Sequence, residues 1–106
     1  MKDISYLDEL EPSIRIPLRK RIKSADGKEE FTELTLNEPC FTHIETFFRN
    51  SEKDGAMAAF SVLISELSSP TVPLQAVQLM NYRDYKKAEV YLLDFLKSPG
   101  STGGTL

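Results

Sequence analysis

The chain has few of the residues that most catalytic and metal sites require. It contains one cysteine, one histidine and no tryptophan among 106 residues. A single cysteine, Cys40, excludes an internal disulfide and a multi-cysteine metal cage. The acidic residues lack the spacing of a calcium loop, and Gly27 stands alone rather than in a phosphate-binding loop. We therefore expect no catalytic residue, no cofactor and no metal, which leaves binding as the chemistry of this chain.

Net charge and hydrophobic content further limit the classes of protein to which this chain can belong. The net charge is −3, with 27% charged and 41% hydrophobic residues, which is typical of a soluble globular domain. So small a charge gives no global electrostatic case for nucleic acid or for a membrane surface. The opening segment MKDISYLDELEP lacks the basic flank and apolar run of a secretory signal. We expect a cytoplasmic protein.

Residues 14–39 have the pattern of a β-hairpin. In residues 14–23 apolar side chains fall mostly on even positions and basic ones on odd positions, the two-residue period of a half-buried strand. Residues 29–36 have types that suit a second strand. Between them, Ser24-Ala25-Asp26-Gly27 is typical of a turn because Asp and Gly tolerate positive φ. Pro17 cannot donate a backbone hydrogen bond, so the first strand should be an edge or carry a bulge there.

The two predicted strands carry charges of opposite sign on their outward faces. These are Arg15, Arg19, Lys20, Arg21 and Lys23 on the first strand and Glu29, Glu30 and Glu33 on the second. Opposite charges on neighbouring strands favour pairing, which explains the basic cluster without nucleic acid. The alternative is a regulatory nucleic-acid-binding module that uses residues 15–23, whose affinity would fall steeply with added salt.

Downstream of the hairpin, apolar residues recur at helical spacing from Thr42 to Lys97. A capping box at residues 42–45 predicts a first helix that ends near Asn50, and a second start at residues 51–54 predicts a helix that stops at Pro70. Thr71-Val72-Pro73 opens a short third helix, and the last helix runs from Asn81 to about Lys97. The predicted fold is α+β, an antiparallel two-stranded hairpin followed by about four short helices.

The same patterns divide the chain into three parts. Residues 14–97 form a single domain, and residues 98–106, SPGSTGGTL, have the composition of a flexible tail. Residues 1–13 form an arm in which Ile4, Leu7 and Leu10 recur every three residues. This arm is either loosely docked or a segment that binds a partner.

Aromatic residues are the side chains of this sequence that are best suited to binding a partner. Most must lie in the core of so small a domain, but tyrosine is common at interfaces because it combines contact area with a hydroxyl. The predicted partner-binding residues lie on the last helix: Tyr82, Tyr85, Tyr91 and Phe95. Cys40 and His43 are close enough in sequence for a thiolate-based hydrolase, but a solvated histidine and a small loop residue are the simpler interpretation.

Two segments of the sequence resemble those of a known protein family. They are IPLRKRI at residues 16–22 and SADGKEEFTELTLNEP at residues 24–39, followed by two helices and by Leu79, Asp84 and Phe95-Leu96. In this order they resemble the small tail assembly chaperones of Mu-like contractile-tailed bacteriophages. The spacing from Leu79 to Asp84 is at least one residue longer than in the family pattern, and the arm lies outside the resemblance.

The resemblance implies a non-enzymatic protein of the bacterial host cytoplasm. Its client would be the tape measure protein, which it would keep soluble during tail tube assembly, and it would be absent from the mature virion. Relatives are often made in a second, frameshift-extended form. In this chain the frameshift would fall in residues 98–106, and the extended form would have the tail tube protein as a further partner. The sequence leaves open whether the chain forms a homo-oligomer.

Overall fold

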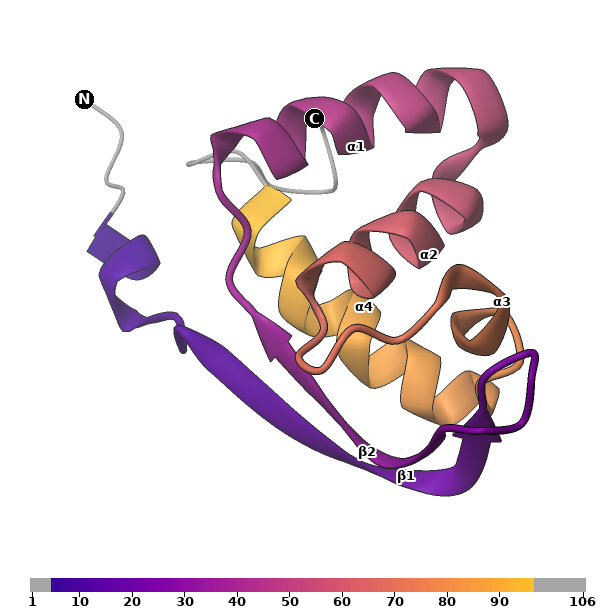
Figure 1. Cartoon of the computed structure of the whole chain (residues 1–106). Coiled ribbons are helices and arrows are strands. Elements are labelled where there is room, and N and C mark those ends of the chain that lie inside the picture. Colours follow the sequence, from indigo (N-terminus) through magenta and orange to yellow (C-terminus); the bar gives the residue numbers. More distant parts are fainter. Residues whose placement is uncertain (1–4, 97–106) are drawn as a thin grey trace.

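The computed structural model of the chain describes residues 5–96 (Figure 1). A short 3-10 helix, η1 (Ser5–Glu9), precedes two strands, β1 (Ser13–Lys23) and β2 (Glu30–Asn37). Four helices follow: α1 (Phe41–Asp54), α2 (Ala56–Leu67), α3 (Leu74–Val77) and α4 (Tyr82–Leu96). The predicted α+β fold, a hairpin and then four helices, is confirmed. The predicted tail, residues 98–106, lies outside the described residues, as does Ile4 of the arm.

The hairpin is antiparallel and its turn is the predicted one. Ile14 faces Leu36 and Ile16 faces Leu34 across the two strands. In the turn, the Asp26 carboxylate accepts hydrogen bonds from the Ser24 hydroxyl at 2.6 Å and the Lys28 N–H at 3.0 Å. These two donors lower the pKa of Asp26, and Gly27 takes a φ of 72°. The turn therefore uses an aspartate as acceptor and a glycine for the left-handed backbone.

The register of the hairpin shifts between Pro17 and Ile22, as the missing N–H of Pro17 predicts. Pro17 faces Glu33 whereas Ile22 faces Phe31, so residues 18–21 of β1 lie opposite the single residue Thr32. A bulge of this kind needs a partner for the backbone groups that leave the ladder. That partner comes from α4, because the Arg19 N–H donates to the carboxylate of Asp84 at 2.9 Å.

The predicted boundary between the first two helices is wrong. Helix α1 begins at Phe41, with Cys40 rather than Thr42 as its N-cap, and it continues beyond Asn50 to Asp54. It ends at Gly55, whose φ of 94° interrupts the helix and whose N–H donates to the Ser51 carbonyl at 3.0 Å. Residues 51–54 therefore form the last turn of α1 instead of a new cap, because the helical hydrogen-bond ladder continues through them until a glycine ends it.

The core lies between the hairpin and the helices. Helix α2 packs on β2 while α4 packs on β1, and α1 forms an antiparallel pair with α2 on the outside (Figure 1). The least exposed large apolar side chains come from β2, α2, the loop before α3, and α4: Leu34, Leu36, Leu63, Ile64, Leu92 and Val72. The helices cover the apolar face of the hairpin. Without them this face would be exposed to water, so the two strands alone would not be stable. None of the described helices has the length and apolar content to span a bilayer.

The end of α2 is attached to the outer edge of β2. The Ser69 N–H donates to the Thr35 carbonyl at 2.9 Å, and the Asn37 side-chain amide donates to the Leu67 carbonyl at 3.2 Å. Helix α3 follows this attachment in the chain and contacts both α2 and β1. The start of α4 is thereby placed beside α3, the first part of α2 and the bulge of β1.

Candidate partner-binding surface

The first turn of α4 is capped by the side chain of Asn81. The side-chain oxygen of Asn81 accepts the Arg83 N–H at 3.0 Å, as expected of an N-cap residue. Asp84 does not return a hydrogen bond to the cap. Its side chain is 0% exposed and reaches the bulge of β1 instead, where one oxygen takes the Arg19 N–H and the other, Oδ1, has no partner among the described residues. This aspartate therefore joins α4 to the hairpin.

The two predicted binding residues Tyr82 and Tyr85 lie together at this end of α4. Their rings are stacked with centroids 6.0 Å apart. Tyr82 is 60% exposed, whereas Tyr85 is only 6% exposed. Burial raises the pKa of Tyr85, and the nearby Glu89 raises it further. Tyr82 therefore presents its ring to solvent, and Tyr85 supports that ring from inside the fold.

A groove of about 290 Å³ opens beside these two rings. Its lining comes from the start of α2, from the end of α3 and the segment after it, and from the start of α4: Met57, Ser61, Val77, Gln78, Met80, Tyr82 and Tyr85. We call it the Met/Tyr groove. Methionine side chains are flexible and adapt to different apolar partners, which is why they are frequent on surfaces that bind many sequences. Met57, 61% exposed, stands at the rim.

Tyr91 and Phe95 form a separate pair at the other end of α4. Their rings meet edge to face with centroids 5.2 Å apart. The Tyr91 hydroxyl donates to the Glu11 carbonyl at 2.6 Å. Burial raises the pKa of Tyr91 to about 12, with further contributions from Glu38 and Glu11. Since six or more helical residues, roughly 9 Å or more along the axis, separate this pair from Tyr82 and Tyr85, the four residues predicted to bind a partner form two separate clusters.

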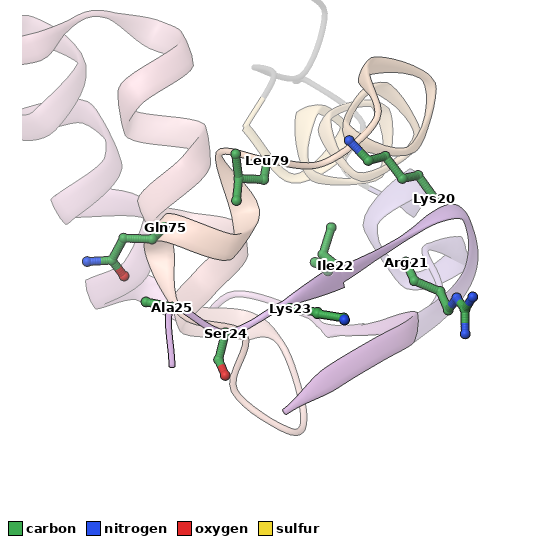
Figure 2. A pocket seen from close by; sticks show the side chains of 8 residues that line it. All are labelled: Lys20, Arg21, Ile22, Lys23, Ser24, Ala25, Gln75 and Leu79. Atoms are coloured by element: carbon green, nitrogen blue, oxygen red, sulfur yellow. The ribbon is translucent and has the colours of Figure 1, made fainter. Parts of the chain in front are cut away.

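A second hollow, of about 340 Å³, lies between the end of β1 and α3 (Figure 2). Figure 2 shows Gln75 and Leu79 on the α3 side and Ile22, Lys23 and Ser24 on the hairpin side. Leu79 is 63% exposed, although leucine is usually buried. Because Met80 follows Leu79 directly and lines the Met/Tyr groove, the segment after α3 presents apolar side chains to both hollows.

Cys40 and His43 are in contact, but at an exposed helix start. The Cys40 sulfur lies 3.2 Å from His43 Nδ1, and the same nitrogen accepts the Cys40 backbone N–H at 3.0 Å. The Thr42 hydroxyl and the His43 N–H lower the pKa of the exposed Cys40 thiol. Since Nδ1 already accepts a backbone hydrogen bond, His43 serves here as a helix-capping residue. None of the hollows described above is lined by either residue.

Comparison with protein families identifies the chain. Residues 15–97 match the family described as phage tail assembly chaperone proteins, E, or 41 or 14. The chain belongs to the phage tail assembly chaperone family. The predicted resemblance is thereby confirmed over nearly the same span. A search of curated proteins and a search of solved structures found no match to this tail assembly chaperone.

The sequence did not indicate two features of this region of the chaperone. Met57 and Met80 meet at one groove, and the buried Asp84 contacts the bulge of β1. No group of histidine, cysteine, aspartate and glutamate suited to a metal ion occurs within residues 5–96. A usable signal was the uncharged segment before Asn81, where the exposed Leu79 and the partly buried Met80 follow a helix of only four residues.

Proposed function

We propose that this tail assembly chaperone binds the tape measure protein of its phage and keeps it soluble while the tail tube assembles. In this role the chain catalyses no reaction. It acts in the cytoplasm of the host bacterium and leaves before the virion is complete. A frameshift-extended form, joined near residues 98–106, would add contacts with the tail tube protein.

The Met/Tyr groove is the observation that carries this proposal. A long helical client exposes apolar stripes before assembly, and such a stripe fits a groove whose walls are themselves apolar and adaptable. Met57 and Tyr82 supply exposed walls, and Tyr85 supplies a rigid floor. The groove is small, so each contact is weak, and many copies along one client would act together.

Co-expression with the tape measure protein encoded by the same phage tests the groove. We compare the wild type with the double variant Met57→Ala and Tyr82→Ala. Alanine is favourable in helices, so both changes remove exposed side chains without disturbing α2 or α4. Phe41→Ala is the matched control, because Phe41 is also an exposed aromatic residue at the first position of a helix. Tyr85→Ala is unsuitable, since it would leave a cavity in the core.

Loss of two anchor side chains should weaken each contact about tenfold or more. The soluble fraction of the tape measure protein should therefore fall with the double variant and stay at the wild-type level with Phe41→Ala. Circular dichroism of each purified variant establishes that it is folded. Equal solubility of the client with all three chains would show that the groove is not the binding surface.

A further inference from the structure

A third hollow has a basic lining that the Met/Tyr groove lacks. It measures about 500 Å³ and is lined by Arg19 from the bulge of β1 and by Arg83, Lys86, Lys87 and Val90 from α4. We call it the basic hollow. Lys86 is paired with Glu89 at 2.6 Å. Within residues 5–96, no ion pair is found for the side chains of Arg19, Arg83 and Lys87, although the chain has more acidic than basic residues.

Stability does not explain this grouping. Arg83 lies three residues from Lys86 and four from Lys87, and like charges at these helical spacings repel each other. Arg83 also lies in the first turn of α4, where the helix dipole favours acidic side chains over basic ones. Two other basic residues of β1 are paired across the hairpin, Arg15 with Glu33 at 3.7 Å and Arg21 with Glu30 at 3.6 Å. The basic hollow therefore brings positive charges together at a cost to the stability of the isolated chain.

The bulge fixes the position of Arg19 in this hollow. Its backbone N–H is held by the buried Asp84 at 2.9 Å, and Asp84 lies between Arg83 and Tyr85 on α4. The contact that shapes the bulge thus also sets the distance between the two elements that supply the positive charges. A surface held by a buried contact is better ordered for binding than one made of free lysines.

We propose that the basic hollow binds an acidic helical segment of a protein partner. Carboxylates on successive turns of that segment meet Arg19, Arg83 and Lys87, and an apolar side chain packs on Val90, which is 53% exposed. The inference rests on the proposed function only for the partner's identity, the tape measure protein. Because Tyr82 and Arg83 are neighbours at the start of α4, one amphipathic helix would place its apolar stripe in the Met/Tyr groove and its acidic edge in the basic hollow.

The lining favours a polypeptide over nucleic acid. No aromatic side chain is among the residues that line the basic hollow, so it offers no platform for stacking bases. Val90 gives it an apolar element that a phosphate backbone cannot use.

Peptide binding tests the inference directly. The probes are a designed amphipathic peptide of about 20 residues, long enough to form a helix, with leucines on one face and glutamates along its edge, and the same peptide with every glutamate replaced by glutamine. A DNA duplex of similar length is the third probe. Fluorescence anisotropy measures their binding to the full chain, to the double variant Arg83→Glu and Lys87→Glu, and to the control Lys28→Glu and Lys53→Glu, which has the same net charge.

The acidic peptide should bind the wild type about tenfold or more tightly than its glutamine form, since each exposed ion pair contributes roughly a factor of two to five. This preference should disappear in Arg83→Glu and Lys87→Glu and persist in the control. Both positions are exposed on α4 and glutamate is a good helix former, so the first variant should remain folded. Equal binding of both peptides, equal loss in the control, or tighter binding of DNA than of the acidic peptide would overturn the inference. Unchanged tape measure solubility with the double variant Met57→Ala and Tyr82→Ala would instead count against the Met/Tyr groove as the client-binding surface and would not bear on the basic hollow.

Discussion

The contact between Asp84 and the bulge of β1 makes a quantitative prediction about stability. Asp84→Ala removes a carboxylate that accepts the Arg19 N–H at 2.9 Å from a side chain that is 0% exposed. A hydrogen bond to a charged group contributes about 1.5–3 kcal/mol. The loss is partly offset because Oδ1 of Asp84 is buried without a partner. We expect a net destabilisation of about 2 kcal/mol, which for a domain of this size lowers Tm by roughly 8–16 °C.

Two companion variants separate this contact from other causes. Asp84→Asn keeps an oxygen that can accept the Arg19 N–H, so it should cost less than about 1 kcal/mol. Arg19→Ala keeps the backbone N–H and removes only an exposed side chain, so its Tm should stay near that of the wild type. Thermal unfolding followed by circular dichroism measures all three. If Asp84→Ala melts within about 2 °C of the wild type, or if Arg19→Ala is as unstable as Asp84→Ala, the backbone contact does not hold the bulge.

Two further substitutions have defined outcomes. The pKa of Tyr91 is raised from 10.0 to about 12 in the folded state, so its contribution to stability is lost as pH rises through about 10 to 12. Tyr91→Phe should make the urea-unfolding free energy fall less steeply in that window, and an unchanged slope would contradict the assignment. Cys40→Ala should leave tape measure solubility at the wild-type level, because the exposed thiol makes its hydrogen bonds to Thr42 and His43 in the first turn of its own helix; a loss of client solubility would refute this.

The hairpin was predictable because its signals are local. Alternating apolar residues fix which face of each strand is buried, and the Asp26-Gly27 turn fixes where the chain reverses. Pro17 predicted the irregularity in β1 for the simple reason that it has no N–H. The contact that stabilises this irregularity could not be predicted, since Asp84 lies 65 residues away from Arg19 in the chain.

The helix boundary near residue 50 shows where local signals mislead. Ser51 followed three residues later by Asp54 has the pattern of a helix start, yet the preceding helix continues through both residues. Gly55 decides the boundary, because its positive φ is costly for any other residue. A capping pattern indicates a helix start only where the helical ladder before it has already ended.

The candidate site was predictable in part. The tyrosines of the sequence predicted that the last helix binds a partner, and Tyr82 of α4 is exposed. The burial of Tyr85 and the attachment of Tyr91 to Glu11 depend on how α4 packs against the hairpin and the arm, which no periodicity in α4 specifies. The Met/Tyr groove combines residues from α2, α3 and α4, so it exists only in the folded chain.

Amide hydrogen exchange of the chain, alone and with the tape measure protein, tests the central claim that the client binds through the Met/Tyr groove. Binding should slow exchange in residues 77–84 and at the start of α2, and leave the first part of α1 unchanged. Protection confined to α1, or no protection in residues 77–84 at a client concentration that saturates the complex, would contradict the claim.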